Sequence, residues 1–208
     1  IMYTSGTTGN PKGVMLSHSN LLAAGRYISS GHDVAHKDVA LCVLPIYHIN
    51  GLCVTVMGTL ASASTLVIPH RFSVSAFWRL IETYRCSWFS AVPTQYSYIL
   101  HNKDMPGKIS CLRFARSASA PLSPEIHRKF EERFKVPIIE TMGLTETGSQ
   151  ISTNPLPPQT RKIGSPGKAY GNKLMIGNNV GDEMERGVTG EILVKGDNVM
   201  MGYFKQPD

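Results

Sequence analysis

One short stretch near the N-terminus, YTSGTTGNPKG at residues 3–13, is unusually dense in groups that can hold a ligand. The hydroxyl side chains and glycines that precede Lys12 are Thr4, Ser5, Gly6, Thr7, Thr8 and Gly9. Glycines let backbone N–H groups approach an anion closely, the hydroxyls are further donors and Lys12 adds a cation, so the stretch suits a polyphosphate. The spacing is not G-x-x-x-x-G-K-[ST], because Pro11 precedes Lys12 and Gly13 follows it. A plain solvated turn is the competing interpretation, since the same residue types dominate ordinary loops.

The elements that must position this loop are predicted from hydrophobic periodicity. Short apolar runs bounded by turn residues predict buried strands, and apolar residues at i, i+3, i+4 and i+7 predict amphipathic helices. The predicted strands are residues 39–45, 64–69, 87–92, 111–116 and 136–140. The predicted helices are residues 20–30 with Ser19 as N-cap, 51–61, 74–84 with Ser73 as N-cap, 93–100 and 124–134. This alternation predicts an α/β fold: a mostly parallel sheet with flanking helices.

Two polar segments follow predicted strands of this sheet. SASAPLS at residues 117–123 comes after one strand, and TMGLTETGS at residues 141–149 comes after another. Ligands of parallel sheets bind beyond the carboxyl ends of the strands. We therefore expect the chemistry of the protein at these two segments.

The local amino-acid composition changes near residue 152, where Pro-rich and Gly-rich stretches begin. We predict that residues 1–151 form the α/β unit and residues 152–208 part of a small β unit, with strands at 173–177 and 189–196. The chain begins in an apolar strand and ends in a turn-like segment. We therefore expect it to be a piece of a longer protein.

The composition is that of an ordinary globular protein, with 208 residues, 42% hydrophobic content and a net charge of +6. The basic residues are spread along the chain, which argues against a nucleic-acid partner. No apolar run is long enough for a membrane span and no secretory signal is present, so we expect a cytoplasmic location. Four scattered cysteines without C-x-x-C spacing predict buried, reduced thiols, and no histidine spacing predicts a zinc site.

Six segments, taken in order, resemble the adenylate-forming superfamily of acyl-CoA synthetases, also called the AMP-binding family. They are YTSGTTGNPKGVMLSHSNL (residues 3–21), LPIYHINGL (44–52), AVPTQYSYIL (91–100), RSASAPLS (116–123), ETMGLTETG (140–148) and GEILVKGDNVMMGYFKQPD (190–208). The resemblance extends over almost the whole chain. It implies the acyl-CoA synthetase fold, with a parallel α/β core followed by part of a small β-barrel-like unit.

The resemblance also implies a two-step reaction that uses ATP, Mg²⁺ and coenzyme A. A small-molecule carboxylic acid attacks the α-phosphorus of ATP to give an acyl adenylate and pyrophosphate, and the thiol of coenzyme A then displaces AMP. A catalytic lysine in a small C-terminal domain is expected to follow Asp208. The present chain by itself is therefore expected not to complete the reaction.

Roles for individual residues follow from the same resemblance. The loop from Thr4 to Lys12 would hold the β- and γ-phosphates, Thr145 would bond the α-phosphate and Glu146 would help to hold Mg²⁺, as carboxylates near phosphates commonly do. The residues that would contact the rest of the nucleotide are Ala118, Ser119, Ala120, Thr141, Met142, Gly143 and Leu144. Ala118 departs from the Gly that is commonest there, and Met142 replaces a Tyr that packs on the base in many members.

The acyl group would lie near Tyr47, His48 and Gly51. The alternative for His48 is a histidine held by backbone at a strand end, and Gly51 could equally be a plain helix-entry residue. The resemblance does not identify the acid: dicarboxylic, branched, aryl and fatty acids all stay open as substrates. A fatty acid would give the protein a role in fatty acid metabolism. Two alternative hypotheses for the function also stay open: an adenylation domain that loads a carrier-protein thiol, and a nucleotide-binding module without catalysis.

Overall fold

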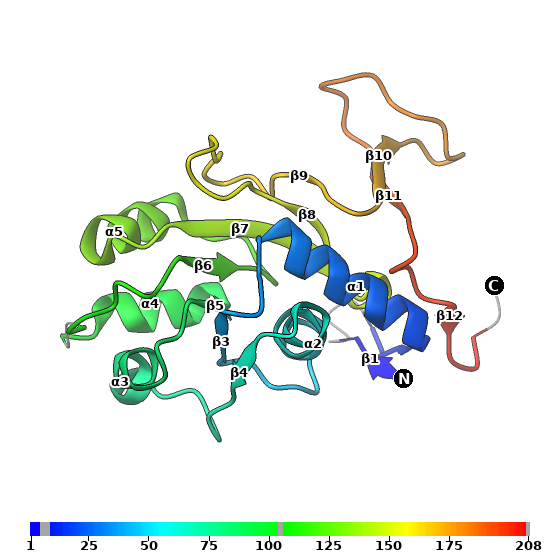
Figure 1. Ribbon diagram of the computed structural model, residues 1–208. Helices are drawn as coiled ribbons and strands as arrows, with labels where there is room; N and C mark the ends of the chain where they lie inside the picture. The colour runs from blue at the N-terminus through cyan, green and yellow to red at the C-terminus, as the bar shows by residue number, and fades with distance from the viewer. Residues whose placement is uncertain (5–8, 104–105, 207–208) are drawn as a thin grey trace.

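The structure, a computed structural model, describes residues 1–4, 9–103 and 106–206. Its centre is a seven-stranded sheet with the strand order β4-β3-β5-β6-β7-β8-β9 (Figure 1). The strands are β3 (Val39–Cys42), β4 (Thr65–Val67), β5 (Trp88–Ala91), β6 (Phe114–Ser117), β7 (Ile138–Leu144), β8 (Ser149–Thr153) and β9 (Lys168–Ala169). The strands from β4 to β7 pair in parallel, whereas β8 and β9 pair antiparallel at one edge. This confirms the predicted α/β fold with a mostly parallel sheet.

Helices cover both faces of the sheet. One group comprises α3 (Val74–Tyr84), α4 (Pro93–His101) and α5 (Pro124–Phe134), and the other α1 (His18–Gly31), the π-helix η1 (Asn50–Met57) and α2 (Gly58–Ser62), on opposite sides in Figure 1. Side chains alternate between the faces along each strand. Leu41 and Phe89 join the core under α3, α4 and α5, while Ala40 and Trp88 join the core with α1 and η1. Within the described part of the chain, no helix is long and apolar enough to cross a membrane.

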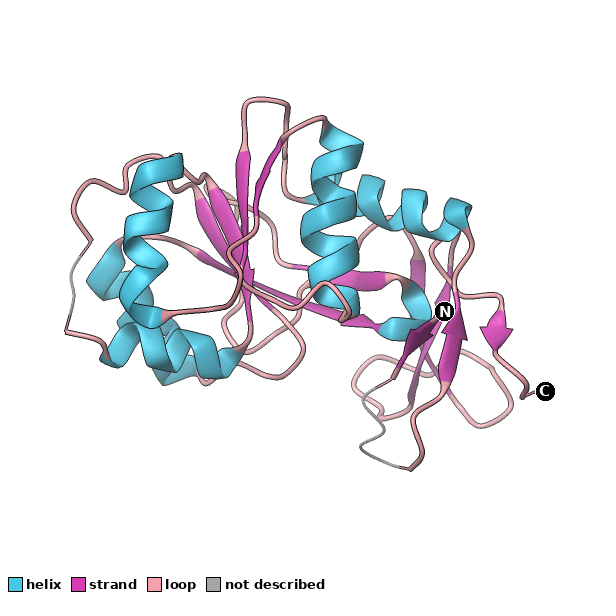
Figure 2. Cartoon of the chain, turned by 90° about the horizontal axis from the view of Figure 1, so that it is seen from below, coloured by secondary structure: helices cyan, strands magenta, loops and turns pink. Residues whose placement is uncertain are grey.

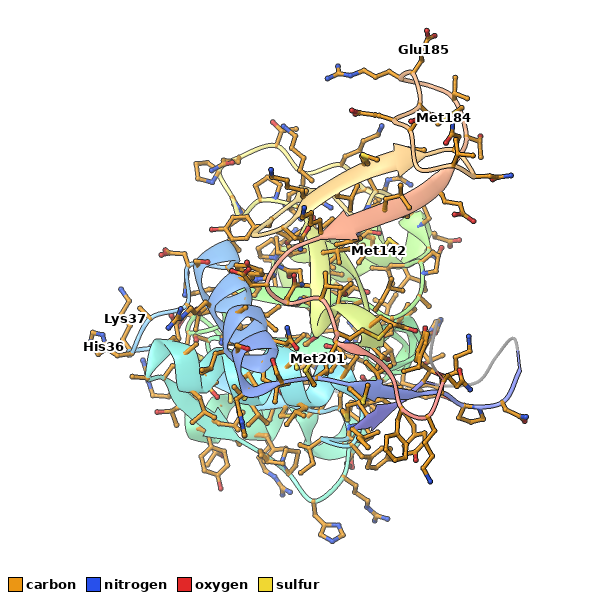
Figure 3. The ribbon with its side chains drawn as sticks, turned by 90° about the vertical axis from the view of Figure 1, so that its right-hand side faces the viewer. His36, Lys37, Met142, Met184, Glu185 and Met201 are labelled. Carbon is orange, nitrogen blue, oxygen red and sulfur yellow. The ribbon has the colours of Figure 1, made fainter. Side chains whose placement is uncertain are left out.

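Two smaller sheets lie beside the central one. The strands β1 (Met2–Tyr3), β2 (Gly13–Met15) and β12 (Gly202–Tyr203) form an antiparallel sheet, so the two ends of the described chain lie close together in Figure 2. The strands β10 (Lys173–Gly177) and β11 (Glu191–Lys195) form an antiparallel pair, which confirms the two strands predicted there. Figure 3 shows this hairpin extending away from the rest of the molecule, with Met184 and Glu185 at its tip. The boundary near residue 152 stays a prediction, and β8 and β9 on either side of it pair with each other.

Several predicted boundaries were wrong in detail. The N-cap of α1 is Ser17 and not Ser19, because Ser17 Oγ accepts the Asn20 N–H at 3.1 Å while Asn20 Oδ1 accepts the Ser17 N–H at 2.9 Å. The predicted strands 39–45 and 111–116 are observed as β3 at 39–42 and β6 at 114–117. The largest difference is β7, which continues to Leu144 instead of ending at Glu140 because β8 pairs with its second half.

The prediction of buried thiols is confirmed for three of the four cysteines, and Cys111 is only partly buried. All four are free, and Cys42, Cys53 and Cys86 are buried. Burial raises the pKa of the Cys53 and Cys86 thiols to about 12. These two side chains therefore act as protonated apolar core residues at neutral pH.

Candidate nucleotide site at the end of the parallel sheet

A cavity of about 330 Å³ opens where β6 and β7 end. Its walls include six of the residues predicted to contact the nucleotide: Ser119, Ala120, Thr141, Met142, Gly143 and Leu144. The other lining residues are Ser117, Pro121, Glu140, Gly164 and Pro166. This places the cavity beyond the carboxyl ends of parallel strands, where ligands of such sheets bind. Its volume lies at the small end of the range for small-molecule sites.

The turn after β6 carries backbone strain at Ser119. This residue has φ 74°, a left-handed conformation that is uncommon outside glycine. The preceding Ala118 is buried, and its N–H donates to the Ala91 carbonyl at 3.3 Å. The conformation that favours glycine thus falls on Ser119 and not on Ala118. The replacement of the common Gly by Ala118 is therefore compatible with this turn.

A buried polar network joins this turn to the segment predicted to border the acyl group. Asn50 Nδ2 donates to Ser119 Oγ at 3.1 Å, and Asn50 Oδ1 accepts from Ser90 Oγ at 3.0 Å and from Arg116 Nη1 at 3.2 Å. Arg116 is fully buried, and this burial lowers the pKa of its guanidinium to about 9. Buried polar groups that bond one another fix a geometry more firmly than exposed ones. The positions of the two segments are therefore coupled through Asn50.

Glu140 lines the cavity and is held in place by the buried His127. Glu140 Oε1 accepts from His127 Nδ1 at 2.9 Å and from the Gly164 N–H at 2.8 Å. The opposite ring nitrogen, His127 Nε2, lies 3.0 Å from Glu131 Oε1. A carboxylate anchored through one oxygen keeps a fixed orientation, and carboxylate oxygens accept hydrogen bonds from amino groups.

This cluster predicts an acid-dependent loss of stability. Burial acts to raise the pKa of Glu131, but hydrogen bonds from His127, Arg161 and the Ile138 N–H outweigh it and hold the pKa at about 2. A carboxyl whose pKa is lower in the folded state than its unfolded value of about 4.3 stabilises the fold above that value, and the contribution is lost as the pH falls toward 2. We expect Glu131→Gln in the full protein to be less stable at pH 7 and to lose less stability on acidification, as measured by urea unfolding. Glu132→Gln, an exposed change on the same helix, is the control, and identical pH profiles for the two variants would contradict the expectation.

Only part of the predicted phosphate loop can be placed. Ser5, Gly6, Thr7 and Thr8 lie outside the described residues. The base of the loop is closed by two hydrogen bonds: the Thr4 N–H donates to the Lys12 carbonyl at 3.0 Å, and the Lys12 N–H donates to Thr4 Oγ1 at 3.0 Å. Gly9 is exposed, and a Cβ added there would meet no atom within 4 Å.

Lys12 and Glu146 meet at a third side chain, Tyr203. Glu146 follows β7 in the short 3₁₀ helix η2 (Thr145–Thr147), which also contains the predicted phosphate ligand Thr145. The Tyr203 hydroxyl donates to Glu146 Oε1 at 2.7 Å, and Lys12 Nζ lies 4.7 Å from the centroid of the Tyr203 ring. The loop cation and the candidate metal carboxylate are thus brought together on one residue.

The residues around Glu146 fit a Mg²⁺ ion that is also bound by substrate oxygens and water. They do not fit a metal site made of protein ligands alone. Among the residues that the structure describes, no three His, Cys, Asp or Glu side chains gather as a metal site. Mg²⁺ near phosphates is usually held by one or two carboxylates together with substrate oxygens and water. A single carboxylate, Glu146, near Lys12 of the predicted phosphate loop agrees with that pattern.

Comparison with known proteins identifies the family. The model of the AMP-binding family, described as AMP-binding enzyme, matches residues 1–204. The chain belongs to the AMP-binding family. It is 46% identical over its whole length to the sulfoacetate–CoA ligase of Cupriavidus necator and 34% identical to the oxalate–CoA ligase of Saccharomyces cerevisiae, covering 41% and 38% of those proteins. The chain thus spans about two fifths of the length of these relatives.

Two solved structures with bound ATP share the fold. ATP-bound MatB from Rhodopseudomonas palustris superposes with a TM-score of 0.92 at 33% identity, with 100% of this chain and 41% of that chain covered. The o-succinylbenzoate CoA synthetase MenE of Bacillus subtilis, in complex with ATP and magnesium ion, superposes with a TM-score of 0.87 at 32% identity, with 99% and 42% covered. Both likenesses confirm an AMP-binding α/β fold.

The segment expected to border the acyl group in this AMP-binding chain lies largely at the surface. Tyr47 is 76% exposed and His48 is also exposed, with their ring centroids 6.2 Å apart. The His48 N–H donates to the Pro45 carbonyl at 3.0 Å. Gly51 is buried, and a Cβ there would lie 2.2 Å from the Pro45 carbonyl oxygen. Gly51 is therefore required by a close backbone approach and is more than a plain helix-entry residue.

Sequence reasoning missed four residues of this site: Asn50, Arg116, Glu140 and Tyr203. Arg116 and Glu140 end the apolar runs predicted at residues 111–116 and 136–140, and a charged residue at the end of such a run is a signal that could have marked them. Asn50 lies within the segment that was singled out for its neighbours. Tyr203 carries no local signal, because its partners are brought to it by strand pairing.

Proposed function

We propose that this chain is the ATP-binding part of an ATP-dependent carboxylate–CoA ligase. The observation that carries the proposal is the meeting of Lys12 and Glu146 on Tyr203, directly after the strand that lines the cavity. Positioned charges stabilise the transition state of phosphoryl chemistry. The lysine of the phosphate loop and the carboxylate that holds the metal ion are therefore needed together at the place where pyrophosphate leaves. Relatives named as CoA ligases support the same proposal.

In the first step an oxygen of the acid attacks the α-phosphorus of ATP, and the bond from that phosphorus to the bridging oxygen breaks. Pyrophosphate leaves with the bonding electrons, and Lys12 and the loop after Thr4 would stabilise its charge. Thr145 would donate to the α-phosphate, while Met142, Ser119 and Ala120 would enclose the base. Mg²⁺ held at Glu146 would supply further positive charge to the phosphates. In the second step the coenzyme A thiolate forms the thioester, and AMP leaves.

The acid is proposed to be short and to carry a second acidic group. Two similar relatives are named for sulfoacetate and oxalate, and both molecules have this character. A fatty acid is the weaker candidate, because neither of these relatives is named for one. Tyr47, His48 and Gly51 are proposed to border the acid, with Asn50 coupling that segment to the adenine turn.

The test is product analysis with the full protein. It would be incubated with ATP, Mg²⁺, coenzyme A and one acid at a time from a panel of oxalate, sulfoacetate, malonate, acetate and octanoate, followed by mass spectrometry. The proposal predicts acyl-CoA and AMP in equal amounts with at least one short acid. Formation of ADP and phosphate, or no acid-dependent AMP at all, would contradict it. Acyl transfer to a carrier-protein thiol with none to coenzyme A would favour the carrier-loading alternative.

A further inference from the structure

Strand pairing fixes Tyr203 beside the phosphate loop. In the small sheet, Tyr203 of β12 lies opposite Val14 of β2, two residues after Lys12. The pairing is extended on both sides: the Phe204 N–H donates to the Gly13 carbonyl at 2.7 Å, and the Met201 N–H donates to the Met15 carbonyl at 2.9 Å. The backbone of Tyr203 therefore follows any movement of the strand that carries the base of the loop.

The residues just before Tyr203 are anchored to the segment that carries Glu146. The Met200 N–H donates to the Glu146 carbonyl at 2.8 Å, and Asn198 Nδ2 donates to the Thr147 carbonyl at 2.7 Å. On the other side, Asn20 Nδ2 of α1 donates to the carbonyls of Asp197 and Val199 at 2.7 and 2.8 Å. In Figure 3 Met201, within this anchored stretch, lies alongside the central part of the molecule and away from the projecting hairpin. The stretch 197–203 thus connects β2, α1 and η2.

The side chain of Tyr203 makes two contacts of different chemistry. Its hydroxyl donates to Glu146 Oε1 at 2.7 Å, and its ring faces Lys12 Nζ at 4.7 Å, within the range of a cation–π interaction. The hydroxyl therefore occupies Oε1 of the Glu146 carboxylate, and the ring lies against the Lys12 ammonium.

We propose that Tyr203 is a positioning residue that orients the Glu146 carboxylate toward Mg²⁺ and holds the Lys12 ammonium beside that carboxylate. The lysine and the carboxylate would then act on the phosphates together. The inference rests on the function proposed above. A hydrogen bond to one oxygen of a metal-binding carboxylate fixes its direction and leaves the second oxygen for the metal, and loss of such a partner typically costs about 10- to 100-fold in metal affinity or activity. The ring contact keeps the Lys12 ammonium near the same point. The competing account is that Tyr203 only anchors the last strand.

The test compares Tyr203→Phe with the wild type in the full protein, because Phe keeps the ring that faces Lys12 and removes only the hydroxyl. Tyr84→Phe, an exposed change on α3, is the matched control. Two quantities are measured: the Mg²⁺ concentration that gives half-maximal pyrophosphate exchange, and the affinity for ATP by calorimetry with and without Mg²⁺. We expect Tyr203→Phe to raise the half-maximal Mg²⁺ concentration about 10-fold and to weaken ATP binding only when Mg²⁺ is present. In a Glu146→Gln background the same change should add no further effect.

Unchanged Mg²⁺ dependence together with a lower melting temperature would overturn the proposal and show that Tyr203 is an anchor of the strand. An equal effect in the Glu146→Gln background would also overturn it, because Tyr203 would then act independently of that carboxylate. The calorimetric readout needs no turnover. Calorimetry can therefore test the role of Tyr203 even if the proposed reaction is wrong. In that case the wild type itself would show no acid-dependent exchange.

Discussion

Replacing Glu146 with Gln is expected to lower the rate of adenylate formation in the full protein by about 10²- to 10³-fold, the loss typical when one positioned electrostatic group is removed from a transition state. Gln keeps the shape and can still accept the Tyr203 hydroxyl, but it removes the negative charge that attracts Mg²⁺. The loss should appear in the first chemical step, measured as single-turnover release of pyrophosphate. Because the defect lies in holding the ion, higher Mg²⁺ should restore part of the rate.

Glu132→Gln is the matched control for this charge change, since Glu132 is exposed on α5. It should keep the wild-type rate. A Glu146→Gln protein as active as the wild type at low Mg²⁺ would show that the carboxylate does not hold the ion, and the role assigned to η2 would be wrong.

Replacing Gly143 with Ala is expected to destabilise the full protein by about 3 kcal/mol, the upper end of the usual cost of overpacking. The strand β7 has a register irregularity between Met142 and Gly143, where β8 approaches closely. A Cβ at Gly143 would lie 1.9 Å from the Ser149 carbonyl oxygen and 2.3 Å from its carbon, so the backbone of β8 must move. Because Gly143 also lines the cavity, ATP binding should weaken as well. Urea unfolding and calorimetry measure the two effects.

Gly31→Ala is the matched control for the glycine substitution. A Cβ there would approach only side-chain atoms, with Gln150 Nε2 and a Tyr170 ring carbon both at 3.2 Å, and these can shift. It should therefore cost much less than Gly143→Ala. Equal unfolding curves for the two variants would contradict the close approach of β8 to β7.

The parallel part of the fold was predictable because each of its elements carries a local signal. The apolar runs of β3 and β5 and the i, i+3, i+4 spacing of α3 reflect burial that each segment shows on its own. The strand β8 and the second half of β7 were not predictable in this way. Their residues, TMGL and SQIST, are polar or mixed, and they form strands only because they pair with each other. Non-local pairing overrides local propensity in such segments.

In the candidate site, too, some residues carry a local sequence signal and others are brought together only by the fold. Lys12, Thr145 and Glu146 stand out by residue type and motif, and six of the seven residues predicted to contact the rest of the nucleotide line the cavity. Tyr203 could not be found, because it lies 57 residues from Glu146 and is brought to it by the pairing of β12 with β2 and by the bond from the Met200 N–H to the Glu146 carbonyl. Ser119 was predicted as a site residue, but its left-handed backbone was not, because that conformation belongs to the turn whose Ser119 hydroxyl accepts from Asn50 Nδ2.

ATP–pyrophosphate exchange by the full protein in the absence of coenzyme A, with the panel of short acids, tests whether this chain takes part in forming an acyl adenylate. Exchange without coenzyme A requires a reversible acyl adenylate, so it isolates the step assigned to this chain. We expect exchange that depends on one of the short acids, and loss of that exchange in both Lys12→Met and Glu146→Gln. Exchange in the absence of any acid, or variants that exchange as fast as the wild type, would contradict it.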